Sequence, residues 1–152
     1  MADYKHILVG LDVLEDGADR VFEHACQAAV ENDARLTIAY VMNVPEFTTL
    51  ERMDPQGAKE LKQEARENLQ QFHAKAEERG VNNVASIVDK GVPKKRIISH
   101  LSKEHNPDLL VIGQTRGSRF YQLLDGNTSN AVKKKANCDV TVVQMNDEPV
   151  KA

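Results

Sequence analysis

Short apolar runs alternate with longer stretches of helical periodicity along this chain of 152 residues. Ile7, Leu8 and Val9 lie together in residues 5–11, and consecutive apolar residues of this kind are typical of a strand buried on both faces of a sheet. In residues 18–32 the apolar side chains instead recur at three- and four-residue steps, which indicates a helix. Strands that alternate with helices predict an α/β fold with a parallel sheet, because parallel strands need a crossover connection that is usually a helix.

The alternation continues to the end of the chain and predicts five strands in all. The further strands are expected at residues 35–41, 84–88, 108–113 and 139–144, and the further helices at residues 58–79, 93–104 and 127–135. Right-handed crossovers then give an open doubly wound sheet with helices on both faces, for which the orders 3-2-1-4-5 and 2-1-3-4-5 are both common. Residues 43–57 contain two prolines and a glycine, and we expect a mobile loop there.

The length of the chain suits one domain, which we expect over residues 1–146, followed by a short tail at residues 147–152. The 20 basic and 23 acidic residues leave a net charge of −3, so the overall electrostatic field does not favour nucleic acid. No apolar run approaches the roughly 20 residues that span a bilayer, and the first residues lack a signal-peptide pattern. We therefore expect a cytoplasmic protein that does not bind membranes.

A glycine-rich segment follows the fourth predicted strand. Gly113, Gly117 and Gly126 come after its apolar run, and the sequence Asn-Thr-Ser, which commonly begins helices, follows the last of them. Glycine lets backbone N–H groups approach an anion closely, and the positive end of a helix dipole favours one. The segment therefore predicts phosphate binding, although glycines that only serve turns are the alternative. In the order 3-2-1-4-5, Asp12 at the end of the first strand would face Gly113 across the ligand crevice.

Four segments together carry a family resemblance. They are Ile7-Leu-Val-Gly-Leu-Asp12, Gly91-Val-Pro93, Leu109-Leu-Val-Ile-Gly113 and Cys138-Asp-Val-Thr-Val-Val143. With them the chain resembles the universal stress protein family over nearly its whole length, and nucleotide-binding members of that family carry the motif G-x2-G-x9-G-[ST] after strand four. The resemblance implies the 3-2-1-4-5 sheet of adenine nucleotide alpha hydrolase-like proteins, a homodimer, a role in stress survival and, in one branch, bound ATP.

The resemblance also implies site residues. It places Asp12 against the adenosine, the backbone of Val41 against the adenine, and the segment after Gly126 against the phosphates. The residues expected to line the nucleotide site are Leu11, Asp12, Val41, Ile112, Gly113, Arg116, Gly117, Gly126, Asn127, Thr128 and Ser129.

The glycine segment departs from the family motif at two positions. Gly113 and Gly126 keep the spacing of thirteen positions, but the second glycine of the motif falls on Arg116, with Gly117 one place later. The Ser or Thr expected after the last glycine is Asn127, which caps helices about as well as serine and can donate a hydrogen bond to an oxygen. Adenine nucleotide therefore remains the expected ligand, and Mg²⁺ could accompany its phosphates.

Three functions remain open from the sequence. The first is a nucleotide-binding regulatory protein whose occupancy alters its association with other proteins. The second is slow ATP hydrolysis, for which the chain lacks the P-loop pattern G-x-x-x-x-G-K-[ST] and offers only Asp12 or Asp125 as a metal ligand near the loop. The third is a dimerisation module that binds no nucleotide.

The last predicted strand indicates a partner chain. It carries Val140, Val142 and Val143, with neither Lys nor Pro to discourage pairing with another strand at the sheet edge. A two-fold symmetric pairing would let each edge cover the other. We therefore predict a homodimer through this strand.

Overall fold

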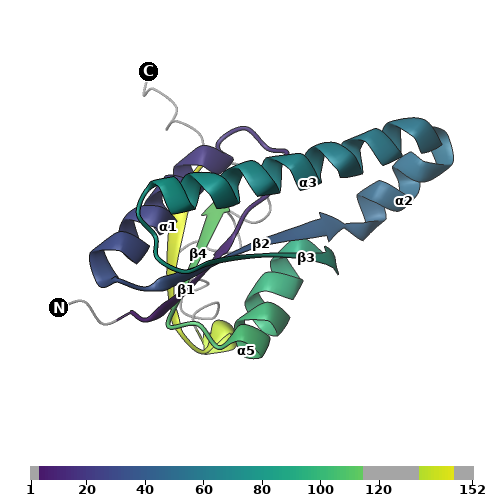
Figure 1. Ribbon diagram of the computed structural model, residues 1–152. Coiled ribbons are helices and arrows are strands. Elements are labelled where there is room, and N and C mark those ends of the chain that lie inside the picture. The colour runs from purple at the N-terminus through teal and green to yellow at the C-terminus, as the bar shows by residue number, and fades with distance from the viewer. Residues whose placement is uncertain (1–3, 115–133, 146–152) are drawn as a thin grey trace, which may run out of the picture.

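The computed structural model describes residues 4–114 and 134–145, which form a five-stranded parallel sheet between helices (Figure 1). The strand order is β3-β2-β1-β4-β5, so the expected order 3-2-1-4-5 is confirmed. Along the chain the elements are β1 (His6–Gly10), α1 (Ala18–Asn32), β2 (Arg35–Asn43), α2 (Val44–Met53), α3 (Pro55–Glu78), β3 (Val84–Gly91), α4 (Pro93–Lys95), η1 (Arg96–Leu101), α5 (Ser102–His105), β4 (Leu109–Gln114) and β5 (Asp139–Gln144).

The sheet separates two layers of apolar packing. On one face, α1 and α3 cover the sheet, with Phe22 of α1 fully buried against β1 and 4.9 Å from the Phe72 ring of α3. On the other face, the helical segment from α4 through α5 packs Ile98 and Leu101 against Leu8 of β1. Because consecutive strand residues point to opposite faces, the apolar run in β1 supplies both layers. The apolar sequence of that strand therefore reflects its central place in the sheet.

Most of the elements lie where the periodicity predicts them, and residues 43–57 are the main correction. We expected a mobile loop there, but α2 occupies most of the segment and α3 begins at Pro55. Both prolines lie in the first turn of a helix, where no backbone N–H is needed. The side chain of Asn43 accepts a hydrogen bond from the Glu46 N–H at 3.3 Å, and that of Asp54 accepts one from the Gly57 N–H at 3.0 Å. These caps start two helices where the prolines alone indicate a break.

Two smaller differences concern the ends of elements. β3 continues to Gly91, beyond the expected residues 84–88, because it pairs along its whole length with the long strand β2. Residues 134–136 are helical, in agreement with the end of the helix expected at residues 127–135, and the rest of that helix lies outside the described residues. None of the helices in the described ranges is long and apolar enough to cross a membrane.

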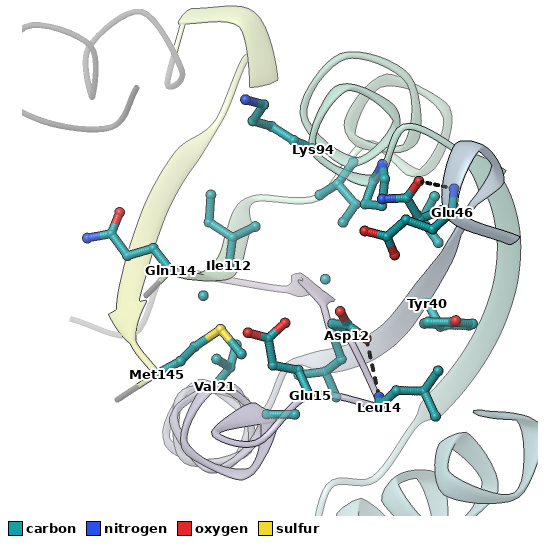
Figure 2. A pocket seen from close by; sticks show the side chains of 18 of the residues that line it. Asp12, Leu14, Glu15, Val21, Tyr40, Glu46, Lys94, Ile112, Gln114 and Met145 are labelled. Carbon is teal, nitrogen blue, oxygen red and sulfur yellow. Dashed lines mark hydrogen bonds between the residues drawn. The ribbon is translucent and has the colours of Figure 1, made fainter. Parts of the chain in front are cut away.

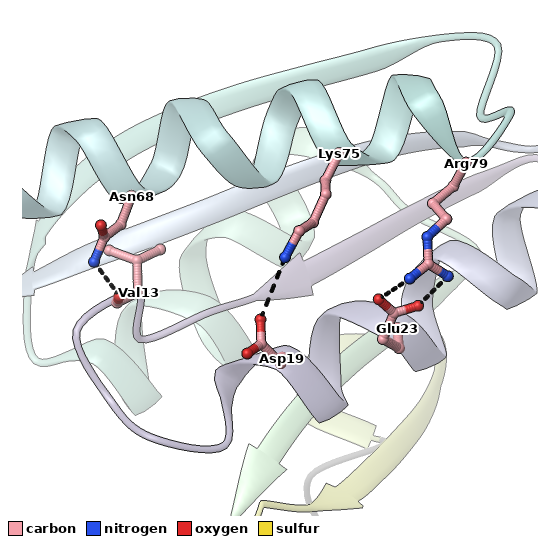
Figure 3. A network of polar contacts seen from close by, with 6 residues as sticks. All are labelled: Val13, Asp19, Glu23, Asn68, Lys75 and Arg79. Carbon is pink, nitrogen blue, oxygen red and sulfur yellow. Dashed lines mark hydrogen bonds and ion pairs between the residues drawn. The ribbon is translucent and has the colours of Figure 1, made fainter.

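Polar contacts hold α3 against α1 and against the segment that links β1 to α1 (Figure 3). The Asn68 side chain donates a hydrogen bond to the carbonyl oxygen of Val13 at 2.9 Å. Further along α3, Lys75 Nζ lies 3.9 Å from Asp19 Oδ1, and Arg79 forms an ion pair with Glu23. The exposed ion pairs contribute little each, so the main effect of this network is to fix the path of the chain after β1.

Candidate nucleotide-binding site

A cavity of about 650 Å³ opens at the carboxyl ends of β1, β2 and β4 (Figure 2). This is the edge of a parallel sheet where α/β proteins bind ligands, and β1 and β4 are the two strands at which the winding reverses. Its volume falls in the range of small-molecule sites. The cavity is lined by Gly10, Leu11, Asp12, Leu14, Glu15, Ala18, Val21, Tyr40, Val41, Asn43, Glu46, Phe47, Leu50, Leu61, Pro93, Lys94, Ile97, Ile112, Gly113, Gln114 and Met145.

Five of the expected site residues meet around this cavity, although they come from three separate strands and the segments that follow them. They are Leu11, Asp12, Val41, Ile112 and Gly113. The parallel register explains their convergence, since β1 pairs with both β2 and β4 and all three strands end at the same edge. The other expected residues, Arg116, Gly117, Gly126, Asn127, Thr128 and Ser129, lie outside the described part of the chain.

Gly113 keeps the β4 side of the cavity narrow. A Cβ atom at this position would lie 2.5 Å from Val21 Cγ2 and 2.7 Å from Met145 Cγ, which is closer than real Cβ atoms approach. The glycine therefore lets α1 and the end of β5 pack directly against the backbone of β4. A ligand that enters from this side meets backbone rather than side chain at Gly113.

Three carboxylates point into the cavity. Asp12 and Glu15 follow β1, and Glu46 lies in the first turn of α2 (Figure 2). The Asp12 carboxylate accepts a hydrogen bond from the Leu14 N–H at 3.2 Å, which orients it toward the cavity. Burial and the neighbouring Asp12, through both its charge and a hydrogen bond, raise the pKa of Glu15. The cavity is therefore a region of negative potential that favours hydrogen-bond donors and positive charge.

Tyr40 adds a hydroxyl group to this acidic side. The residue is only 4% exposed and lines the cavity at the end of β2. Burial, and then the charges of Asp12 and Glu46, raise the pKa of its phenol to about 12. The hydroxyl therefore keeps its proton throughout the physiological range and can both donate and accept a hydrogen bond.

Gln114, the last residue of β4, brings a buried amide to the opposite side. Its Oε1 atom is buried and finds no hydrogen-bond partner among the described residues. In Figure 2 this amide extends away from the three carboxylates, and a buried acceptor without a partner costs about 1–3 kcal/mol.

α2 and the start of α3 close one side of the cavity, a role that was not predicted for residues 43–57, and they contribute Glu46, Phe47, Leu50 and Leu61. The signal that could have indicated α2 was Asn43 followed three residues later by Glu46, a spacing typical of helix starts. Lys94 also lines the cavity, and in Figure 2 its side chain extends away from the three carboxylates. The described residues contain no cluster of three or more His, Cys, Asp or Glu side chains that could hold a metal ion.

Comparison with known proteins identifies the family. The universal stress protein family profile matches residues 3–144. The chain belongs to the universal stress protein family. One relative named as a universal stress protein, from Staphylococcus aureus strain USA300, is 32% identical over 149 residues, which cover 98% of this chain and 89% of the relative. The family membership inferred from the four sequence segments is therefore confirmed.

Solved structures of universal stress proteins share the fold. The universal stress protein UspA from Lactobacillus plantarum superposes with a TM-score of 0.73 at 26% identity, over 95% of this chain and 100% of that one. A universal stress protein described as in complex with cAMP superposes with a TM-score of 0.64 at 24% identity, over 94% of this chain and 98% of that one. The second similarity, at this level of identity, concerns the fold alone.

Proposed function

We propose that this universal stress protein is a cytoplasmic regulatory protein that binds an adenine nucleotide and acts as a homodimer. One observation supports the nucleotide above the others: Leu11, Asp12, Val41, Ile112 and Gly113, expected at the site from sequence, line one cavity at the strand ends where the winding reverses. The cAMP complex of a protein with the same fold adds support. The alternatives are a dimerisation module without nucleotide and a slow ATPase.

The charges around the cavity favour one orientation of the nucleotide. Phosphates are disfavoured beside Asp12, Glu15 and Glu46, whereas the amino group of adenine and the ribose hydroxyls are donors that these carboxylates can accept. The nucleoside would therefore occupy the described cavity. The phosphates would extend toward the glycine-rich segment that begins at Gly113.

Thermal unfolding of the ligand-stripped protein with ATP, AMP, cAMP and GTP tests the proposal. At a hundredfold excess over Kd, a bound nucleotide adds about 2.7 kcal/mol, which corresponds to a Tm increase of roughly 5–10 °C. Asp12→Ala should remove most of this increase, and Glu64→Ala, an exposed substitution on α3, should leave it unchanged. If no adenine nucleotide raises Tm, the alternative without nucleotide is correct. Steady phosphate release that Asp12→Ala abolishes would indicate the ATPase instead.

The homodimer is tested separately. Among the described residues β5 lies at the edge of the sheet and pairs with β4 alone, and its residues are exposed or partly buried. Sedimentation velocity should give a dimer for the unmodified protein and a monomer for Val142→Lys, because a lysine in the paired edge would place an uncompensated charge there. A sedimentation coefficient that does not change with the substitution would exclude this interface.

A further inference from the structure

The cavity extends past the residues expected for the nucleotide into a second part, which we call the hairpin lobe. Its walls are apolar side chains from three places in the chain, with Tyr40 at the end of β2 and Glu46 at the start of α2 between them. The apolar residues are Leu14, Phe47, Leu50 and Leu61. In Figure 1, α2 and the first half of α3 extend beyond the ends of β2 and β3, and residues of both helices line this lobe.

The Tyr40 hydroxyl is an unused polar group in this lobe. Tyr40 is more than nine-tenths buried, and its hydroxyl makes no hydrogen bond within residues 4–114 and 134–145. Over the same residues, the only fully buried side-chain polar atom without a partner is Gln114 Oε1, so the Tyr40 oxygen is not sealed inside the protein and opens into the cavity. Tyrosine hydroxyls that are otherwise buried usually find a partner, which here would be a ligand.

The charge of the lobe indicates the sign of that ligand. The Glu46 carboxylate makes neither a hydrogen bond nor an ion pair with the described residues, and Asp12 and Glu15 direct two more carboxylates at the same space. Burial raises the pKa values of Glu15 and Tyr40, and the charge of Asp12 raises both further. Among the described residues these carboxylates do not form a group of three ligands that could hold a metal ion.

We propose that the hairpin lobe binds an organic ammonium ion carried on an apolar body, such as an arylalkyl or alkyl amine. The ammonium N–H groups would donate to Glu46 and to the Tyr40 oxygen, and the carbon body would pack against Leu50 and Leu61. The four apolar residues of the lobe lie outside the expected nucleotide site, whereas Glu46 also faces the proposed nucleoside, so an amine and a nucleotide would compete where they overlap.

An NMR titration of the full-length ¹⁵N-labelled protein at pH 7.5 tests the sign of the charge. The probes are 2-phenylethylamine, the neutral 2-phenylethanol and the anionic 3-phenylpropionate, which have similar shapes. We expect the amine to bind at least tenfold more tightly than either of the others, with the largest amide shifts at the end of β2 and in α2. Equal affinities for the three probes, or amide shifts confined to other surfaces, would overturn the proposal.

Two variants and a matched control locate the site. Glu46→Gln keeps the shape and removes the charge, and we expect it to weaken amine binding at least fivefold, whereas Glu51→Gln on the same helix, whose carboxylate pairs with Lys62, should leave binding unchanged. Tyr40→Phe should weaken binding about threefold. Amine affinities that are the same in Glu46→Gln and Glu51→Gln would contradict the assignment. Nucleotide binding is measured on the same samples without the amine, so that a failure of amine binding and a failure of nucleotide binding are told apart.

Discussion

The two ends of the parallel sheet use similar side chains in opposite ways. At the amino ends of β1 and β4, the Asp108 carboxylate accepts hydrogen bonds from the N–H groups of Lys5 and His6, at 2.6 and 2.9 Å. The His6 ring lies between Thr37 Oγ1, 2.8 Å from Nε2, and Arg35 Nη2, 3.3 Å from Nδ1. Arginine can only donate, so Nδ1 accepts and Nε2 donates to the threonine. Polar groups at this end stabilise the fold.

At the carboxyl ends Asp12 accepts a hydrogen bond from the Leu14 N–H, but several other polar groups lack such partners. Glu15 and Asp12 lie close enough to repel one another, and the Tyr40 hydroxyl and Gln114 Oε1 find no partner within the described residues. Groups of this kind cost stability unless a ligand contacts them. Polar residues at strand ends therefore indicate a binding site where, as for Tyr40 and Gln114, the fold leaves hydrogen-bonding groups without partners among the described residues.

The largest expected effect is at Gly113, where the fold and the site overlap. Gly113→Val would force a side chain against Val21 and Met145, and overpacking of this kind costs about 2–3 kcal/mol. We expect urea denaturation to show this loss of stability. The added side chain would also narrow the cavity and weaken nucleotide binding. Unchanged stability in Gly113→Val would mean that α1 and β5 move apart without cost.

The second largest effect distinguishes the amino end of the sheet from the carboxyl end. Asp108→Ala removes the acceptor of two N–H groups at the amino end, which we expect to lower the free energy of unfolding by about 1–2 kcal/mol. Ligand affinity at the carboxyl end should stay the same, because the altered position lies at the other end of β4. Urea denaturation and calorimetric titration measure the two quantities. A parallel loss of affinity would break the distinction between a stabilising end and a binding end.

The sequence predicted the fold well because its signals are local. The apolar run of β1 and the helical spacing of α1 each appear within one segment, and the family resemblance selected one of two possible sheet orders. The error at residues 43–57 arose because the prolines were interpreted as breaks in the helical pattern. A proline is also common in the first turn of a helix, and here it follows Asn43, which caps α2. The prolines indicated a break, whereas Asn43 indicated the start of a helix. Only the packing of α2 against β2 and α3 decides between the two.

The site was predicted only in part, since its residues come together by tertiary contact. Asp12 and Gly113 were expected because the sheet order brings two strand ends to one crevice. Tyr40 and Glu46 were not expected at the site, because the sequence of β2 does not indicate that α2 and α3 cover the end of this strand. Whether a polar group is satisfied also depends on distant residues, such as those that pair with Asp108, and no sequence pattern contains that information.

The smallest expected effect is a dependence of stability on pH that has opposite signs at the two ends. Burial and the charge of Arg35 lower the pKa of His6, so its contribution is present above the ordinary histidine pKa of 6.5 and is lost as the pH falls below it. Burial and Asp12 raise the pKa of Glu15 above 4.5, so the folded protein holds the proton more tightly than the unfolded chain. The ionised Glu15 therefore lowers stability above its folded pKa, and that penalty disappears as the pH falls toward 4.5.

Glu15→Gln isolates the acidic part of this dependence. The substitution removes a like charge beside Asp12, and because Glu15 is exposed and screened we expect a gain of only about 0.5 kcal/mol at pH 7.5, or roughly 1–2 °C in Tm. At pH 4 the unmodified protein already holds the proton, so the two Tm values should converge, whereas the loss that follows protonation of His6 should be the same in both. Differential scanning calorimetry from pH 4 to 8 measures both trends. A Tm gain of Glu15→Gln that stays constant over this range would show that the glutamate acts through its shape rather than its charge. The carboxyl end of the sheet would then no longer differ from the amino end in its response to acid.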